Sequence, residues 1–523
     1  MVPNTSIRPV HAARRKSASL QCAGTCRCHP AINLYPPLNS LRKKIGLQFL
    51  VSNGATVANF SLSVILARLL TPEDVGIFSM SAILVTFAHV FRDFGVFSYI
   101  VKEKEVNLQT IRTALGVLLL SSWSVAAILY FSSYLWSDFF KTPEVGDVVK
   151  VLAIGFVFIP FGSIPFALLT RNLEVKRTSK VMAISVVTYF IASIVLAYTG
   201  HGHMTMAWAN LINIIVTGAA YHWYSTTPMP WIPSLKGWQR ITHFGTGSIT
   251  TSTIAALDMA LPDVMLGKMS TPSAVGYFNK AVSAVALPYT VFKSTIDYFA
   301  LPYLSRLHHA NEDMAGAIQQ ASSYISVIII PAMVWMTVMD REIILFLFGP
   351  QWEGSVNVMP WLCLGGAVAV LFRLTPPALM SIGKPYVAAV PLLLILSIKI
   401  ALALVLFDGS LVSFGIAMAV GQIIGIPALL FINRHYFGLG VRRWLRGNVS
   451  ILIVSAATGC VSWLMKTYVH PNASLFFSLL INGVGFLVAW YVCVITIKPP
   501  IEVEVRRFSA SARGILRRRW SDT

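Results

Sequence analysis

Apolar runs of 18 or more residues recur between residues 47 and 497, and this pattern restricts the fold more than any other feature. Runs of this length cross a lipid bilayer as α-helices, because every backbone polar group must be hydrogen-bonded inside the spanning segment. A membrane β-barrel does not fit, since its strands alternate in polarity over about 10 residues. Only 12% of the residues are charged, against about 25% in soluble proteins. The sequence therefore predicts an all-α polytopic membrane protein.

We expect about fourteen spanning helices, arranged as two six-helix lobes with two further C-terminal helices and a central cavity. The expected spans are 47–67, 76–101, 112–136, 148–170, 180–199, 203–224, 244–267, 276–304, 316–339, 356–381, 386–407, 411–433, 449–468 and 474–497. The predicted segments are a disordered basic cytoplasmic tail (1–41), an N-lobe (42–224), a cytoplasmic linker (225–243), a C-lobe (244–433), the last two spans (434–497) and a basic cytoplasmic tail (498–523).

The two predicted lobes share a repeated motif. Residues 64–78 read VILARLLTPEDVGIF and residues 264–278 read VMLGKMSTPSAVGYF, with seven identical positions and Arg68 matched by Lys268. Each copy should end one apolar helix, make a Thr-Pro turn and open the next helix. The repeat predicts two lobes of the same orientation, related by a pseudo-two-fold axis along the membrane normal. Such duplicated bundles are typical of transporters.

The net charge of +20 has a specific distribution. In a soluble chain it would suggest nucleic acid as a partner. Here most of the 41 Lys and Arg residues fall in the tails and in the loops on one side of the predicted spans. The positive-inside rule then places both termini in the cytoplasm, where basic residues contact anionic membrane lipid. We expect no nucleic-acid partner.

The N-terminal tail contains Cys22, Cys26, Cys28 and His29. They could form a metal site, but no second ligand pair with zinc-finger spacing accompanies them, so no metal is expected. Basic residues near Arg14 are not followed by an apolar core, so a cleaved signal peptide is not expected. An overlong start of the chain is an alternative explanation of this tail.

Charged residues inside the predicted spans are candidates for function. Each costs about 2.5–3.5 kcal/mol at a helix centre, so they should face a wet cavity or one another. Arg92, Lys293 and Arg373 fall at similar depths toward the cytoplasm, on helices of both lobes. Three cations at one level predict a patch that binds a pyrophosphate, because Arg engages phosphate oxygens bidentately and Lys acts as a point charge.

Other charges leave more than one interpretation open. Lys280 and Lys399 are assigned to the same cationic cavity, although the position of Lys280 near an outer helix end favours snorkelling to the membrane surface. The facing of Lys399 is open. Asp93, Asp258 and Asp297 are candidate ion-binding or salt-bridge partners. Salt bridges from Arg92 or Lys293 to Asp93, and from Lys293 to Asp297, are the alternative to an exposed cationic patch.

The first predicted span has a polar face. Ser52, Thr56, Asn59 and Ser63 fall in one helical stripe that could line the cavity. The seventh span repeats this with Ser248, Thr251 and Asp258. Packing of helix on helix is the alternative role, because Ser and Thr form hydrogen bonds across close helices.

Several enzyme motifs are missing from the sequence. There is no Walker motif and no HExxH motif, and no loop is long enough to hold a nucleotide-sugar-binding domain. We therefore expect no enzymatic activity and no cofactor.

Three segments carry a family resemblance. They are ARLLTPEDVGIFSMSAILVTFAHVFRDFGVFSYIVKEKE (67–105), TPSAVGYFNKA (271–281) and FGPQW (348–352). They resemble the Wzx-type oligosaccharide flippases, which are polysaccharide exporters of the multidrug/oligosaccharidyl-lipid/polysaccharide superfamily, and the likeness covers about residues 42–497.

The resemblance implies a two-lobed bundle of twelve or fourteen helices in the bacterial inner membrane. It implies transfer of undecaprenyl-pyrophosphate-linked oligosaccharide to the outer leaflet for lipopolysaccharide or exopolysaccharide export, with a cationic cavity. It also implies an ion gradient or membrane potential as the energy source, and a polysaccharide polymerase complex as a possible partner. No motif for sugar contact transfers, so the glycan is open.

Two other functions fit part of the sequence. A multidrug/cation antiporter of the same superfamily would use acidic residues in its spans, and Asp93, Asp258, Asp263 and Asp297 could serve. A membrane scaffold within a polysaccharide synthesis complex would bind partners without transporting anything.

Overall fold

The structure is a computed structural model that describes residues 38–93, 95–103, 106–225, 232–469 and 474–497. The chain divides into two compact units, residues 1–45 and 46–523, and the account below concerns the second. Most of the two predicted tails lies outside the described residues, as does the Cys22, Cys26, Cys28 and His29 group. The side chains of Asp93, Ser248, Thr251 and Asp297 are also not described.

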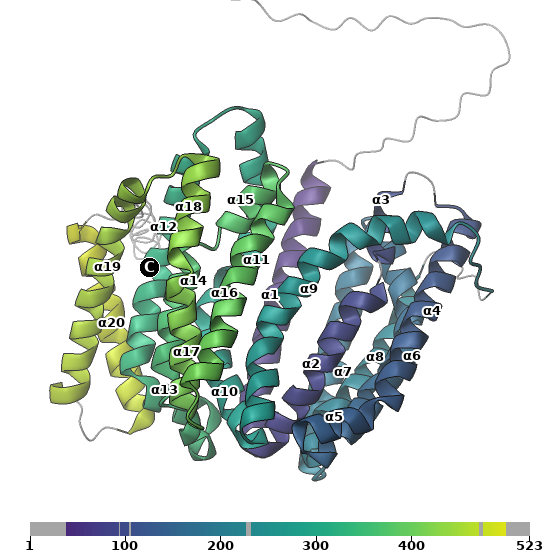
Figure 1. The fold of residues 1–523 in the computed structure, drawn as a ribbon, viewed down its shortest axis with the longest axis horizontal. Helices are drawn as coiled ribbons and strands as arrows, with labels where there is room; N and C mark the ends of the chain where they lie inside the picture. The colour runs from purple at the N-terminus through teal and green to yellow at the C-terminus, as the bar shows by residue number, and fades with distance from the viewer. Residues whose placement is uncertain (1–37, 94, 104–105, 226–231, 470–473, 498–523) are drawn as a thin grey trace, which may run out of the picture. The chain divides into compact units, whose positions relative to one another are not determined.

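The described residues are almost entirely helical and contain no β-strand. Figure 1 shows the helices running roughly parallel to one another. The first part comprises α1 (Leu38–Leu69), α2 (Pro72–Asp93), α3 (Val96–Lys102), α4 (Leu108–Phe131), α5 (Ser133–Phe140), α6 (Pro143–Arg171), α7 (Val175–Tyr198) and α8 (Thr205–Tyr224). The second part comprises α9 (Trp238–Met269), α10 (Pro272–Val285), α11 (Leu287–His309), α12 (Met314–Val338), α13 (Asp340–Phe348), α14 (Met359–Leu371), α15 (Thr375–Ser381), α16 (Pro385–Leu406), α17 (Leu411–Ile424), α18 (Ile426–Phe437), α19 (Val441–Leu464) and α20 (Leu475–Ile497).

Ten helical stretches among the described residues are long and apolar enough to cross a membrane. The all-α polytopic prediction is thus confirmed, while the count of about fourteen spans stays a prediction. Several predicted spans are interrupted helices: 276–304 breaks at Ala286 and 411–433 breaks at Gly425. In both cases the second helix has a proline in its first two positions. Proline lacks the N–H that would continue the preceding helix, which explains the break.

The repeated Thr-Pro motif forms the same turn twice, as predicted. α1 ends at Leu69 and α2 begins at Pro72, while α9 ends at Met269 and α10 begins at Pro272. The Thr71 hydroxyl accepts a hydrogen bond from the Asp74 N–H (3.2 Å), and the Thr271 hydroxyl accepts one from the Ala274 N–H (3.3 Å). These side chains cap N–H groups that the helix itself leaves unpaired, so each motif starts a helix at a fixed residue.

The two copies of the motif pack against each other. α2 and α10 are in contact, and the contact is reciprocal at their first turns. A Cβ added at Gly76 would overlap the carbonyl of Pro272, and a Cβ added at Gly276 would overlap the carbonyl of Pro72. Glycine is therefore required at both positions, because only its missing side chain lets the backbones approach so closely.

A basic residue in each copy of the motif, just before the Thr-Pro turn, forms a hydrogen bond to a short helix of the other part. Arg68 Nη2 donates to the carbonyl of Phe346 (2.5 Å), at the end of α13. Lys268 Nζ donates to the carbonyl of Phe139 (2.8 Å), at the end of α5. Carbonyls in the last turn of a helix have no partner inside that helix, so each cation satisfies one of them and also opposes the negative end of the helix dipole.

The end of α1 receives donors in return. Gln351 Nε2 and Trp352 Nε1 both donate to the carbonyl of Ala67, at 2.8 and 2.6 Å. Both residues come from the FGPQW segment, and the Trp352 side chain is fully buried. The helices around α2 and α10 are thus joined at this end by main-chain groups of both parts.

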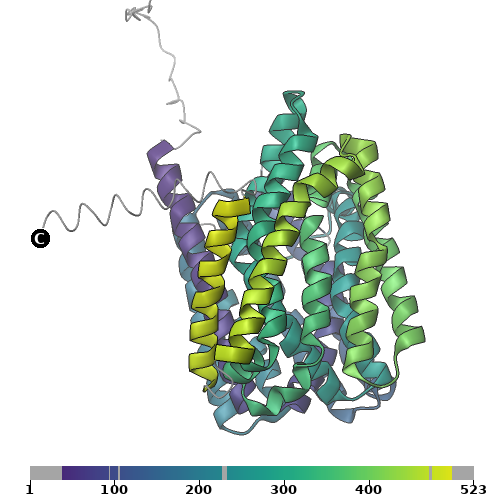
Figure 2. The ribbon, with the colours of Figure 1, turned by 90° about the vertical axis from the view of Figure 1, so that its left-hand side faces the viewer.

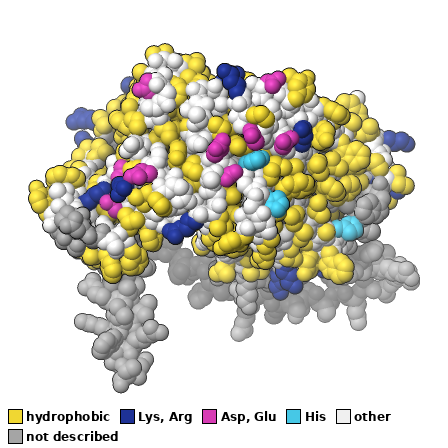
Figure 3. Space-filling model, turned by 90° about the horizontal axis from the view of Figure 1, so that it is seen from below, with side chains coloured by type: hydrophobic (Ala, Val, Ile, Leu, Met, Phe, Trp, Pro, Cys, Tyr) yellow, Lys and Arg dark blue, Asp and Glu magenta, His cyan; other side chains and the backbone are white. Residues whose placement is uncertain are grey.

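The end of the bundle with α5 and α13 carries acidic and basic side chains mixed over a largely apolar surface (Figure 3). Ion pairs at this end join Arg341 to Glu353 (2.9 Å) and Lys150 to Asp147 (3.0 Å). No strong excess of basic side chains is visible on this face.

The last two long helices, α19 and α20, form one side of the bundle (Figure 2). α19 packs on α12, and α20 packs on α19. Trp335 of α12 donates from Nε1 to Asn482 Oδ1 of α20 (3.1 Å), and Trp490 of α20 donates to the carbonyl of Val327 (2.9 Å). These bonds hold the pair against the second part, away from α2.

Candidate functional site

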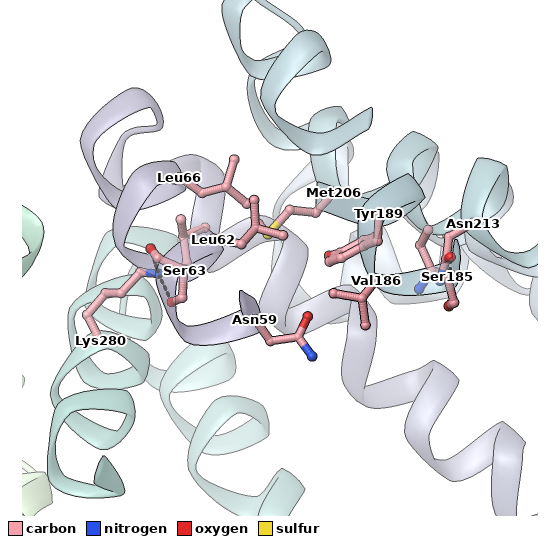
Figure 4. Close-up of a pocket in the computed structure, with 12 residues that line it drawn as sticks. Asn59, Leu62, Ser63, Leu66, Ser185, Val186, Tyr189, Met206, Asn213 and Lys280 are labelled. Carbon is pink, nitrogen blue, oxygen red and sulfur yellow. Dashed lines mark hydrogen bonds between the residues drawn. The ribbon is translucent and has the colours of Figure 1, made fainter. Parts of the chain in front are cut away.

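A polar cavity of about 470 Å³ lies among α1, α7, α8 and α10 (Figure 4). Its polar lining residues are Asn59, Ser63, Ser185, Asn210, Asn213 and Lys280. The remaining wall is mainly apolar, and the first turn of α2 contributes to it through Val75. Residues of both repeats therefore contribute to one cavity, because Lys280 follows the second copy of the Thr-Pro motif.

Among the described residues that line this cavity, Lys280 is the only charged one. Its ammonium donates to the Ser63 hydroxyl (3.1 Å) and to the Ser63 carbonyl (3.3 Å), as Figure 4 shows. It also lies 5.5 Å from the ring centres of both Phe348 and Trp352, a favourable cation–π distance. The residue is only 6% exposed.

The snorkelling prediction for Lys280 is therefore wrong. Snorkelling requires a path along the helix to the membrane surface. Here α1 and the FGPQW segment cover that path, and Ser63 and two aromatic rings supply partners inside the protein. The side chain is held in the cavity wall.

The polar face of α1 divides into two parts. Asn59 and Ser63 line the cavity, in agreement with the predicted role of this face. The Thr56 hydroxyl instead donates to the Ser52 carbonyl one turn earlier (3.0 Å). A hydroxyl satisfied by its own helix is typical of Ser and Thr in membrane helices, so Thr56 needs no cavity to explain it.

A second cavity, of about 250 Å³, lies among α10, α11, α12 and α14. Its wall is almost entirely apolar apart from Arg373 and Tyr289. Arg373 lies in the turn between α14 and α15, with its guanidinium carbon 4.7 Å from the Tyr289 ring centre. The ring fixes the position of a charge that would otherwise be free to move among rotamers.

Arg373 and Lys293, two of the three cations predicted to form a patch, are both related to Tyr289 of α11. Tyr289 and Lys293 are four residues apart on α11, so their side chains lie on one face of that helix. Arg373 contacts Tyr289, and the side chains of Arg373 and Lys293 are both exposed. Arg92 lies on the last turn of α2, where its carbonyl accepts a hydrogen bond from Ser121 of α4 (2.8 Å). A single patch of all three remains a prediction.

An ion pair joins two predicted spans that the sequence did not connect. Lys399 Nζ of α16 lies 3.0 Å from Asp258 Oδ1 of α9. Asp263, five residues further along α9, accepts a hydrogen bond from Asn279 of α10 (2.8 Å). The similar depth of Lys399 and Asp258 in their predicted spans was the one sequence feature that pointed to this ion pair. Depth alone does not show which helices are neighbours. The predicted pairs with Asp93 and Asp297 fall on side chains that are not described.

No group of three or more His, Cys, Asp or Glu residues that could hold a metal ion occurs in the part of the chain that was described. The expectation of no metal and no cofactor is not tested by this observation.

The family model described as "Polysaccharide biosynthesis protein" matches residues 65–357. The chain belongs to this family. The matched range holds both Thr-Pro turns, the FGPQW segment and the lining of the Lys280 cavity except Asn59, Leu62 and Ser63. The resemblance to Wzx-type polysaccharide exporters is thereby confirmed at the level of the family.

Curated relatives carry names from the same area of biology. The chain is 22% identical over 310 residues to the lipopolysaccharide biosynthesis protein WzxC of Escherichia coli (strain K12), a match that covers 58% of this chain and 62% of that protein. It is 20% identical over 351 residues to the succinoglycan biosynthesis transport protein ExoT of Rhizobium meliloti (strain 1021), covering 67% and 71% of the two chains. The match with WzxC thus spans less than two thirds of the length of that relative.

Solved structures with the same fold include two kinds of membrane transporter. The structure titled "Lipid II flippase MurJ, inward closed conformation" aligns with a TM-score of 0.71 at 15% identity, covering 86% of this chain and 98% of that one. An inward-facing MATE multidrug transporter aligns with a TM-score of 0.55 at 14% identity, covering 74% and 95%. Identities this low establish the fold alone.

Proposed function

We propose that the protein is a flippase that moves undecaprenyl-pyrophosphate-linked oligosaccharide across the bacterial inner membrane during polysaccharide export. Membership of the polysaccharide biosynthesis protein family supports this role. The names of the relatives, which refer to lipopolysaccharide biosynthesis and to succinoglycan transport, support it as well. Transport occurs without covalent change to the substrate, so the protein acts as a carrier and not as an enzyme.

The observation that carries the proposal is the charge of the two cavities. Lys280 lines the first and Arg373 lines the second, and the described residues of both linings include no acidic side chain. Asp258, which could otherwise bind a cation, is paired with Lys399. Basic side chains in cavities of an apolar bundle attract an anion, and a pyrophosphate is the anionic part of this substrate class.

The same observation argues against the cation-antiporter alternative. A cation site in a membrane protein requires carboxylate or carbonyl oxygens, since an unpaired ammonium or guanidinium repels the ligand. The fold is shared with multidrug transporters, but fold does not decide between a flippase and an antiporter.

The arrangement of α2 and α10 supports alternating access. Their first turns meet at the end that carries α5 and α13, and cations of each part bind main-chain carbonyls of the other. Opposite ends of the two parts would open and close in turn around the cavities. We place this closed end outside the cytoplasm, because basic residues do not dominate it (Figure 3). Both termini then lie in the cytoplasm.

The substrate, membrane lipids and a polysaccharide polymerase complex are the proposed partners. The energy source is proposed to be an ion gradient or the membrane potential. An anionic substrate that moves outward is driven by an inside-negative potential, worth about 2.3 kcal/mol per charge per 100 mV.

Reconstitution into vesicles tests the proposal. A fluorescent undecaprenyl-pyrophosphate glycan is placed in both leaflets, and the fraction exposed outside is read with a membrane-impermeant quencher. The protein should bring the probe to full accessibility. Lys280→Met and Arg373→Gln should slow the rate about 10-fold or more, since a charge-assisted hydrogen bond is worth about 1.5–3 kcal/mol.

Lys150→Gln is the matched control, because Lys150 is an exposed residue whose contact is Asp147 on the same helix turn. Vesicles that show no movement of any undecaprenyl-pyrophosphate glycan would contradict the flippase role. Binding of polymerase components without movement would then favour a scaffold.

A further inference from the structure

A third cavity adjoins the Lys280 cavity on the side of α6. It has a volume of about 190 Å³ and lies among α6, α7 and α8. The two cavities share Ser185 of α7 and Asn213 of α8 in their linings. We refer to the two neighbouring cavities together as the α7–α8 groove.

The polar groups of this groove are arranged around Asn213. Its Oδ1 accepts hydrogen bonds from the Ser185 hydroxyl (2.9 Å) and from the Thr217 hydroxyl (3.1 Å). With the carbonyl oxygen engaged twice, the NH₂ of this amide is left with no hydrogen bond to the described residues. The bonds from Ser185 and Thr217 therefore fix the orientation of the Asn213 amide, and its NH₂ remains available to a ligand.

Two more amides border the same space. Asn59 of α1 and Asn210 of α8 line the groove, and their side chains form no hydrogen bond within the described part of the chain. Figure 4 shows Asn59 and the Tyr189 hydroxyl extending from α1 and α7 toward the same space. If these amides served only to join helices, they would be bonded across the interface, as Ser185 and Asn213 are.

The chemistry of the lining selects among possible occupants. An isoprenoid chain would leave the amides of this groove without hydrogen-bond partners, and a metal cation would require carboxylates, which do not occur among the described lining residues. Among the described lining residues Lys280 is the one charge and lies at one end, so a diphosphate can be held there while the rest of the groove suits an uncharged ligand. Amide and hydroxyl groups both donate and accept hydrogen bonds, which matches the hydroxyl groups of sugars.

Aromatic side chains complete this match. Phe166 and Tyr221 line the inner cavity, with ring centres 5.2 Å apart. Ligand sites of this kind combine aromatic walls with a small number of positioned polar groups. The flat C–H faces of pyranose rings fit such walls, while their hydroxyl edges face the amides.

We propose that the α7–α8 groove binds the glycan part of the lipid-linked substrate and so determines which glycan is transported. The ligand class is an uncharged oligosaccharide of hexoses and N-acetylhexosamines. The inference rests on the proposed flippase function, with the pyrophosphate bound by basic residues that include Lys280 at one end of the groove.

The test compares two kinds of ligand on the full-length protein in lipid nanodiscs. One is undecaprenyl pyrophosphate without sugar, and the other is a panel of undecaprenyl-pyrophosphate glycans with one to five hexose or N-acetylhexosamine residues. At least one glycan should bind more tightly than the bare carrier. Asn213→Ala and Asn210→Ala should each weaken that glycan about 3- to 10-fold, as expected for a lost hydrogen bond, and leave the bare carrier unchanged.

Asn433→Ala is the matched control. Asn433 is a buried amide that is hydrogen-bonded to Thr375 (3.2 Å) between α18 and α15, far from the groove in the sequence. It should alter neither affinity. Thermal unfolding of every variant separates lost binding from lost folding.

Three results would overturn the inference. These are a panel in which no glycan binds better than the bare carrier, groove variants that weaken both ligands equally, and groove variants that weaken neither. None of them touches the flippase role if the reconstituted protein still moves the probe. Failure of all movement by the unaltered protein would instead reject the proposed function itself.

Discussion

The ammonium of Lys399 and the carboxylate of Asp258 lie 3.0 Å apart, although 141 residues separate them in the chain. They join α16 to α9, and α9 also packs on α2, α3 and α4. The side chains of Lys399 and Asp258 are 15% and 37% exposed, so the ion pair is only partly buried in the protein. This ion pair therefore links α16 to α9, the helix of the second part that contacts α2, α3 and α4 of the first.

A double-mutant cycle should show this coupling. Lys399→Met or Asp258→Asn alone should destabilise the protein by about 1–3 kcal/mol, below the 3–5 kcal/mol of a fully buried pair, because Asp258 is partly exposed. The double variant should recover much of the loss, since no charge is left unpaired. Chemical unfolding in detergent provides the measurement, and strictly additive effects would rule out the coupling.

Alanine at either Gly76 or Gly276 should prevent closure of α2 on α10. In each case the new Cβ meets a backbone carbonyl, which cannot move as a flexible side chain could. Overpacking costs about 1–3 kcal/mol, which shifts a two-state equilibrium about 5- to 150-fold away from the closed arrangement. Surface polysaccharide at equal protein level should fall for both variants.

The control for these substitutions is Gly483→Ala on α20. There the nearest atom to an added Cβ is a ring carbon of Trp335 at 3.8 Å, an ordinary contact. This variant should export normally. Normal export by the Gly76 and Gly276 variants would show that the close contact is not used.

Removal of Arg68 or Lys268 should open the end of the protein that carries α5 and α13. Arg68→Ala and Lys268→Ala each remove a donor from a helix end, worth about 0.3–1 kcal/mol. We expect Asn59→Cys, in a background without the six native cysteines, to react about 2- to 5-fold faster with an impermeant maleimide added outside. Lys150→Ala is the control. Unchanged labelling would mean that these bonds do not hold the closed end.

Tyr289 should control the affinity for the carrier through Arg373. Tyr289→Phe keeps the ring under the guanidinium and should bind undecaprenyl pyrophosphate normally, whereas Tyr289→Leu should bind about 2- to 5-fold more weakly, as expected for a cation–π contact of about 0.5–1 kcal/mol. Calorimetric titration measures both. Equal affinities for the Phe and Leu variants would exclude the ring as a positioning group.

Much of the fold could be predicted because its signals are local. Eighteen-residue apolar runs predict helices without reference to their neighbours. The Thr-Pro turns at residues 71–72 and 271–272 are set by capping chemistry within four residues, and both are found where expected. Proline marks a place where a span can break, as Pro288 does just after Ala286, but hydropathy alone does not distinguish an interrupted helix from a continuous one.

The site was predictable only in part, because side-chain facing depends on which helices are neighbours. The charge of Lys280 was visible in the sequence, but its burial depends on Ser63 and Trp352, 217 residues before it and 72 after it. Asn210 and Asn213 were missed, whereas Asn59 belonged to the predicted polar face. Uncharged polar residues are common in membrane helices, and no spacing distinguishes those that border a cavity.

During synthesis, the carbonyl of Ala67 is made long before Gln351 and Trp352, which donate hydrogen bonds to it. Trp352 follows it by 285 residues, which corresponds to roughly 15–60 s of translation at about 5–20 residues per second. Until then the first helix stands in the bilayer with an unpaired oxygen at its end, although its own sequence is finished. The final packing of that helix is consequently a late step of biogenesis. A nascent chain that stops before Gln351 would leave the end of α1 uncovered and open to quality-control proteases.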